Sequence, residues 1–127
     1  MISIKEMEAM LEELAEELPS EFYKELNGGI MLLPETKRNT ILDTDNLFIL
    51  GEYHRSGSLG RFITMYYGSF CHVHGHLNAQ QLKNKLRKTL RHEFRHHIES
   101  LAGERGLEIE DAKFLADYKR NIGKESK

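Results

Sequence analysis

The chain has 127 residues, of which 39% are hydrophobic and 30% are charged, and its formal net charge is −2. This length suits a single domain over residues 1–127 with one modest core, and the composition excludes disordered and fibrous classes. The longest apolar runs cover only residues 30–33 and 47–50, far short of the ~20 residues that a membrane span requires. A single cysteine, Cys71, and a start without a signal-like apolar segment predict a cytoplasmic protein.

The first two thirds of the chain combine helical and strand patterns. Apolar residues recur at helical spacing from Met7 to Leu18 and predict a helix over residues 4–18, which Pro19 ends. A short second helix and a turn at 27–29 follow. Strands are expected at 30–33, 47–53 and 61–67, with a short fourth strand at 70–74, and the polar stretch 35–45 is expected to be a loop. These elements predict an α+β fold with N-terminal helices and a small mixed sheet of three to four strands.

A long helix is predicted after residue 78. Its apolar residues step along mostly four apart and form one stripe: Leu82, Leu86, Leu90, Phe94, Ile98 and Leu101. The stripe indicates an amphipathic helix over 78–102 that ends near Gly103 and Gly106. A C-terminal helix is expected over 107–122.

The long helix carries residues 92–96, which read His-Glu-Phe-Arg-His. His92 and His96 project from successive turns, at the spacing that lets two imidazoles share one metal ion. Glu93 is rotated by about 100° from His92, so it can stand beside the metal rather than on it. In this motif the two nitrogens hold Zn²⁺, the metal lowers the pKa of a water molecule, and the glutamate takes the proton.

A zinc site needs a third protein ligand. Asp111 is the first candidate, because it lies in an inward-facing stripe of the predicted last helix and a buried carboxylate needs a partner. A solvated place in the first helical turn is the alternative interpretation of Asp111. Glu108 is the second candidate. Glu99 lies about 10 Å along the helix from His92, so we expect it to stay off the metal.

The sequence predicts different roles for the other histidines. His97 falls inside the apolar stripe and is expected to be a buried residue held by a hydrogen bond. His72, His74 and His76 alternate, so on a strand all three would face one side. A polar strand end with incidental metal affinity is the favoured interpretation. A second metal site and a role in substrate binding are the alternatives.

The segment from Lys83 to Arg95 is basic and raises the question of nucleic acid. A solvated helix face is the favoured interpretation, because aromatic residues are not interleaved with the basic ones. Nucleic-acid binding therefore ranks last among the functions considered.

The order of these features resembles the minimal zincins, small bacterial zincin-like metallopeptidases. The resemblance rests on residues 11–22 (LEELAEELPSEF), on 50–53 and 61–66 (LGEY and RFITMY), and on 90–97 (LRHEFRHH). It implies a compact zincin-like domain with a small sheet packed on the active helix, zinc at His92 and His96, and Glu93 as the base. Where typical members have a glycine two residues after the doubled histidine, this chain has Glu99. The third ligand must then come from farther along the chain.

Hydrolysis of peptide bonds by a zinc-activated water is thus the first hypothesis, with a peptide or protein substrate. An extended substrate could pair with an edge strand, and the strand near 61–67 is the expected one. A non-catalytic metal-binding or interaction domain with the same fold is the alternative. The substrate and the oligomeric state have no signature in the sequence.

Overall fold

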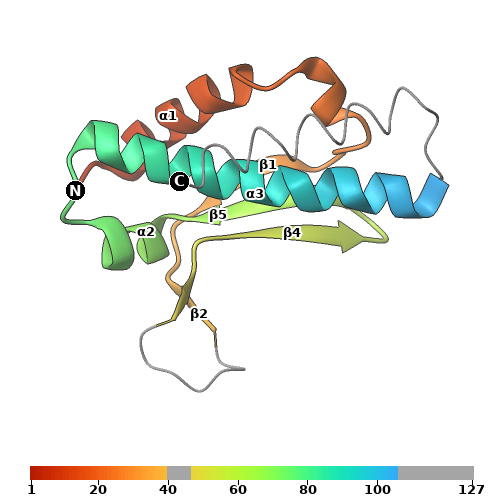
Figure 1. The fold of residues 1–127 in the computed structure, drawn as a ribbon. Coiled ribbons are helices and arrows are strands. Elements are labelled where there is room, and N and C mark those ends of the chain that lie inside the picture. Colours follow the sequence, from red (N-terminus) through yellow and green to blue (C-terminus); the bar gives the residue numbers. More distant parts are fainter. Residues whose placement is uncertain (40–46, 106–127) are drawn as a thin grey trace.

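The computed structural model describes residues 1–39 and 47–105. Within these ranges the chain is an α+β domain, as predicted, with its two longer helices on one face of a small sheet (Figure 1). The predicted C-terminal helix over 107–122, together with Glu108 and Asp111, lies outside the described residues.

Helix α1 (Ile4–Glu16) begins with a reciprocal cap. The Glu6 amide donates to Ser3 Oγ at 3.2 Å, and the Ser3 amide donates to the Glu6 carboxylate at 3.1 Å, so two otherwise unpaired amides at the helix start are satisfied. The helix buries Met7, Leu11 and Leu14 and ends two residues before the predicted end. The short 3-10 helix η1 (Ser20–Tyr23) follows Pro19, at the expected second helix.

The main sheet has three strands, β1 (Gly29–Leu33), β4 (Gly51–Ser56) and β5 (Gly60–Tyr66), in the order β1-β5-β4. β5 pairs in parallel with β1 and antiparallel with β4, so the predicted mixed sheet is confirmed. Side chains alternate between the two faces of a strand. Ile63 and Met65 of β5 accordingly point into the core, and both are 0% exposed.

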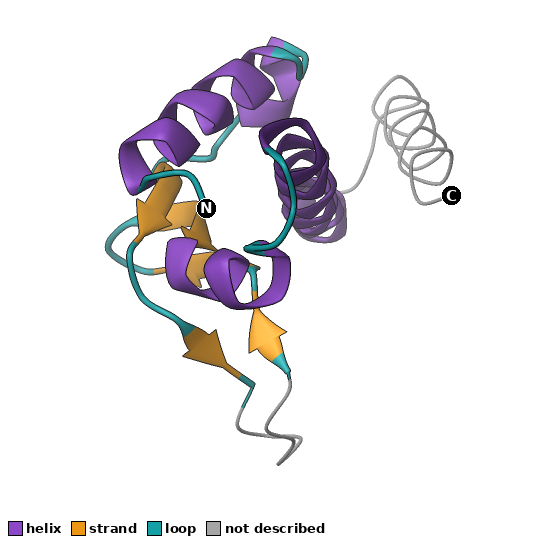
Figure 2. Cartoon of the chain, turned by 90° about the vertical axis from the view of Figure 1, so that its left-hand side faces the viewer, coloured by secondary structure: helices purple, strands orange, loops and turns teal. Residues whose placement is uncertain are grey.

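The predicted strand over 47–53 is wrong in one respect, because the chain leaves strand geometry at Leu50. Before that break, β3 (Phe48–Ile49) pairs antiparallel with β2 (Lys37–Arg38), which lies inside the stretch predicted to be a loop. This two-stranded ribbon projects away from the main sheet on the side opposite α1 (Figures 1 and 2).

Residues 67–74 form a helix, α2 (Tyr67–His74), rather than the predicted fourth strand. The helix starts directly after β5, and its buried residues Ser69 and Phe70 pack inward. The Ser69 hydroxyl accepts a hydrogen bond from the Lys37 amide at 2.9 Å, which ties α2 to β2. Apolar alternation in a short segment cannot separate a strand from a helix.

Helix α3 (Ala79–Arg105) is the long helix predicted over 78–102. Asn78 and Gln81 cap it reciprocally, at 2.9 and 3.1 Å. The predicted apolar stripe is confirmed, because five of its residues are at most 6% exposed: Leu82, Leu86, Leu90, Phe94 and Ile98. Figure 2 shows α3 beside α1, over the same face of the sheet. No helix in the described part of the chain is long and apolar enough to cross a membrane.

Candidate metal site and cleft

His92 and His96 converge on one point beside α3. Their Nε2 atoms lie 3.2 Å apart, and the two rings are nearly perpendicular at 89°. Two nitrogens bound to one tetrahedral zinc, at roughly 2.0–2.1 Å each, stand about 3.3 Å apart. Burial lowers the pKa of His92, and the neighbouring His96 lowers it further. The imidazole is therefore held in the neutral form that binds metals.

Glu93 is buried beside this pair, with only 7% of its surface exposed. Burial raises the pKa of its carboxyl from 4.5 to about 7, and the negative charge of Glu52 contributes to the rise. A backbone hydrogen bond from Tyr53 opposes the rise. A carboxyl with a pKa near neutrality can both accept and release a proton at physiological pH.

Strand β4 runs along the site and forms the edge of the three-stranded sheet next to α3. The strand predicted for this position, over 61–67, is instead the central strand β5, which is paired on both sides. Gly51 of β4 permits close packing on α3. A Cβ atom there would lie 3.1 Å from Thr89 Cγ2 and 3.0 Å from Met65 Sδ.

No third candidate ligand joins His92 and His96 among residues 1–39 and 47–105. In these ranges no group of three His, Cys, Asp or Glu side chains could hold a metal ion. The Glu99 carboxylate accepts a hydrogen bond from Arg95 Nε at 2.9 Å. Asp111 and Glu108 lie outside the described residues, so their roles stay predictions.

His97 is buried and hydrogen-bonded, which confirms its predicted place in the core. Its Nε2 lies 2.8 Å from the Lys24 carbonyl oxygen, which can only accept a hydrogen bond. Nε2 therefore carries the proton, and Nδ1 accepts from the Tyr53 hydroxyl at 2.8 Å. His97 thus links α3 to β4 and to the segment after η1.

The three alternating histidines do not share a face, because α2 is a helix. The His72 ring stacks on Phe48, with centroids 4.9 Å apart, whereas His74 lines a cavity beside Glu93. The expected strand-face grouping with His76 is therefore wrong. The alternation that suggested it belongs to strands and not to helices.

A polar network that was not predicted lies on the face of the sheet opposite the core residues Ile63 and Met65. Glu52 accepts hydrogen bonds from Lys37 and, at 2.6 Å, from Tyr66. Burial alone would raise the pKa of Glu52, but these two hydrogen bonds together with the nearby positive charge of Lys37 lower the pKa overall. Thr64 extends the network from Tyr66 to His54. The alternation of polar and apolar side chains along β4 and β5 indicates that each strand has a polar face. The register in which the two strands pair, which brings these polar side chains together, cannot be predicted from composition or spacing.

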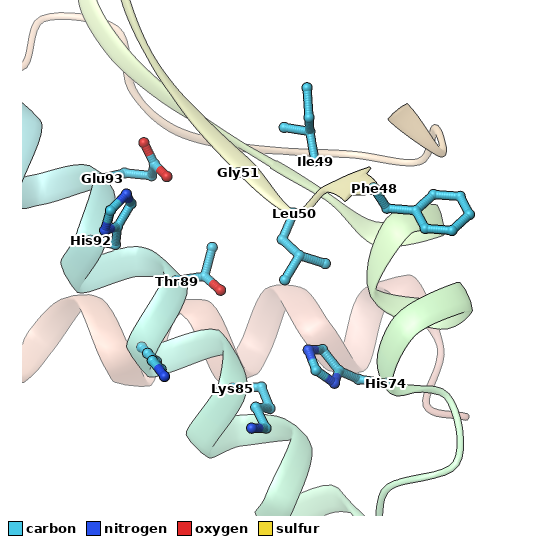
Figure 3. Close-up of a pocket in the computed structure, with 10 residues that line it drawn as sticks. Phe48, Ile49, Leu50, Gly51, His74, Lys85, Thr89, His92 and Glu93 are labelled. Atoms are coloured by element: carbon cyan, nitrogen blue, oxygen red, sulfur yellow. The ribbon is translucent and has the colours of Figure 1, made fainter. Parts of the chain in front are cut away.

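Two cavities flank Glu93. One, of about 480 Å³, extends toward α2 and β3, and the other, of about 670 Å³, extends along β4 toward Arg55. Figure 3 shows the first, with His92 and Glu93 at one end, His74 and Lys85 at the other, and Thr89 and Leu50 between them. Gly51 and Glu93 line both cavities, which we together call the cleft, and His92 lines the first cavity and His96 the second.

Neither protein-family models nor curated proteins match the sequence. Among solved structures, the chain is similar to a conserved hypothetical protein from Thermus thermophilus, with 34% sequence identity and a TM-score of 0.69. The match covers 80% of this chain and 98% of the other.

Proposed function

We propose that this chain, which belongs to the same family as the conserved hypothetical protein of Thermus thermophilus, is a zinc-dependent metallopeptidase that hydrolyses peptide bonds. The observation that carries the proposal is the 3.2 Å separation of the His92 and His96 Nε2 atoms, close to that of two ligands on one zinc ion. The minimal-zincin resemblance of residues 90–97 supports it.

The residues of the site have two roles, metal binding and proton transfer. His92 and His96 would hold zinc, which supplies a Lewis acid that makes water more acidic and polarises a carbonyl group. Glu93 takes a proton from the attacking water on its carboxylate and returns it to the leaving amine. Its pKa of about 7 suits both steps.

β4 is the strand best placed to align an extended substrate. It has one neighbour in the sheet, β5, and it lines both cavities through Gly51. A peptide that added to its other edge would lie between β4 and the histidines of α3, with main-chain hydrogen bonds holding it in register.

Zinc content is the direct test of the site. We expect the purified full chain to hold about one zinc per molecule, as expected for a dedicated site, and a His92→Ala, His96→Ala double variant to lose it. A His72→Ala, His76→Ala variant is the matched control, because it removes two histidines outside the site. Stoichiometric zinc retained in the first variant would rule out these ligands.

Glu93→Gln tests catalysis separately from metal binding. We expect this variant to keep its zinc and to lose cleavage of a fluorescence-quenched peptide library, because the amide cannot accept the proton from water. Asp111→Asn and Glu108→Gln, measured for zinc affinity, distinguish the two candidates for the third ligand. Glu99→Gln is the control for a carboxylate that is paired with Arg95.

A non-catalytic metal-binding domain is the second candidate function. It is favoured by one observation, that no third ligand joins the two histidines within residues 1–39 and 47–105. This alternative predicts zinc in the wild-type protein but no cleavage of any peptide in the library, with or without Glu93.

A further inference from the structure

The basic residues between Lys83 and Arg95 of α3 separate into two groups in the structure. Four of these six are paired with carboxylates: Lys83 with Glu13, Arg87 and Arg91 with Glu17, and Arg95 with Glu99. Across the described ranges, neither Lys85 nor Lys88 has an acidic side chain within ion-pair distance. Both of these lysines line the same cavity beside Glu93. Between residues 83 and 95, the positive charge that has no acidic partner in the described part of the chain therefore lines this cavity.

The helix places these two lysines in line with the metal site. Lys85, Lys88 and His92 are spaced by three and four residues, so they share one face of α3. Lys88 lies about 6 Å, and Lys85 about 10 Å, from His92 along the helix axis. An extended peptide advances about 3.3 Å per residue. If the bond to be cleaved lies at His92 and His96, a peptide side chain two or three residues away from that bond therefore reaches the ammonium groups of Lys88 and Lys85.

Apart from Glu93, the described residues that line this cavity include no acidic side chain. Its lining includes the apolar residues Phe48, Ile49 and Leu50 and, at the far end, His74 (Figure 3). Burial lowers the pKa of His74, and the nearby charge of Lys85 lowers it further. Glu93, at the metal-site end, is the one acidic residue among the described residues that line the cavity.

The second cavity has a different charge pattern. Arg55 lines it together with Glu52 and Glu99, so both signs are present. A ligand that spans the cleft would therefore meet net positive charge only on the side of Lys85 and Lys88.

We propose that Lys85 and Lys88 make the enzyme selective for peptides with an Asp or Glu side chain two or three residues to one side of the cleaved bond. This inference rests on the proposed peptidase function and specifies its substrate class. The two ammonium groups bind the carboxylate, and the apolar wall packs against the neighbouring parts of the peptide.

A peptide fits this cavity better than a nucleic acid. Binding of single strands relies on aromatic rings that are open for stacking and on a basic track. The Phe48 ring is already stacked on His72, and Arg38 lies 5.5 Å from its centroid. The basic residues that would continue a track along α3 are paired with Glu13 and Glu17.

The test compares blocked octapeptides that differ only at two adjacent positions, Glu-Glu, Gln-Gln or Lys-Lys, together with an oligothymidine of eight nucleotides. The protein is the full chain with Glu93→Gln and added zinc, so that no peptide is cleaved. Each partly exposed ion pair contributes a factor of up to about five. We therefore expect the Glu-Glu peptide to bind about tenfold tighter than the Gln-Gln peptide, and 0.5 M salt to remove most of the difference.

Lys85→Glu, Lys88→Glu should abolish or reverse this preference. Lys5→Glu, Lys24→Glu is the control of equal charge, because both lysines are exposed and neither lines a cavity beside Glu93. Equal affinity for all three peptides, or a preference that survives the first variant, overturns the proposal. Tighter binding of the oligothymidine that depends on the same lysines overturns it in favour of a phosphate ligand.

Cleavage by the wild-type chain separates this proposal from the peptidase proposal. Cleavage of peptides without regard to acidic residues would overturn the selectivity alone. A lysine-dependent preference for the Glu-Glu peptide, without cleavage of any peptide by the wild type, would overturn the peptidase and retain the acidic ligand.

Discussion

At the scale of single residues, His97 supports the site from the protein interior. It directly follows His96, and its two ring nitrogens connect α3 to Lys24 and to Tyr53 of β4. Both contacts require the neutral ring, since Nδ1 must accept and Nε2 must donate. Burial lowers the pKa of His97 below 6.5, which favours that same form.

The neutral ring predicts acid sensitivity. Below pH 6.5 the unfolded chain binds a proton at His97 before the folded chain does, so the contribution of His97 to the free energy of unfolding falls as the pH is lowered. We expect the free energy of unfolding of metal-free His97→Phe, measured in urea from pH 8 to pH 5, to become more favourable relative to wild type as the pH is lowered, because the variant lacks the His97 contribution. Tyr53→Phe should cost about 1 kcal/mol but keep the dependence. Equal slopes for wild type and His97→Phe would contradict this assignment.

At the scale of elements, the contact between β4 and α3 sets the width of the cleft. It depends on Gly51, where a Cβ atom would meet Met65, Thr89 and the Thr64 carbonyl at 3.0–3.2 Å. Gly51 also lines both cavities, so any displacement of β4 there alters the surroundings of Glu93.

Gly51→Val should therefore lower the free energy of unfolding by about 1–3 kcal/mol, as overpacking in a dense interior does. Gly57→Val is the matched control, because a Cβ at Gly57 meets nothing within 4 Å. Urea unfolding of both variants compares them. A Gly51→Val protein as stable as the control would show that β4 and α3 can separate at little cost.

At the scale of the whole molecule, the buried carboxyl of Glu93 costs stability. Between pH 4.5 and about 7 the folded chain holds a proton on Glu93 that the unfolded chain has lost. The contribution of Glu93 to the free energy of unfolding of the metal-free protein should therefore fall by about 3 kcal/mol as the pH rises through this window. Glu93→Gln should lack this loss and be the more stable protein at pH 8, as measured by thermal unfolding. A variant no more stable than wild type would contradict the burial penalty.

The helical parts of the molecule could be predicted more fully than the strands. The stripe from Leu82 to Ile98 repeats over many turns, so α3 and the buried place of His97 follow from spacing alone. Segments 47–53 and 70–74 are too short for periodicity to be decisive. It cannot show that the strand predicted over 47–53 breaks at Leu50, or that residues 70–74 form a helix and not a strand. Which strand is central and which lies at an edge depends on the pairing of β1 with β5, and no local sequence pattern predicts that pairing.

The parallel pairing of β1 with β5 has a consequence for the order of folding. The antiparallel β4–β5 hairpin closes over a short loop, whereas β1 reaches β5 only across all of β2, β3 and β4. Contacts that are distant in sequence form late, because closing the longer loop costs more entropy. We therefore expect β1 to dock last, bringing Ile30 and Leu32 beside Ile63 and Met65. Until it does, β5 presents an unpaired edge, and the nascent chain is most exposed to aggregation in that interval.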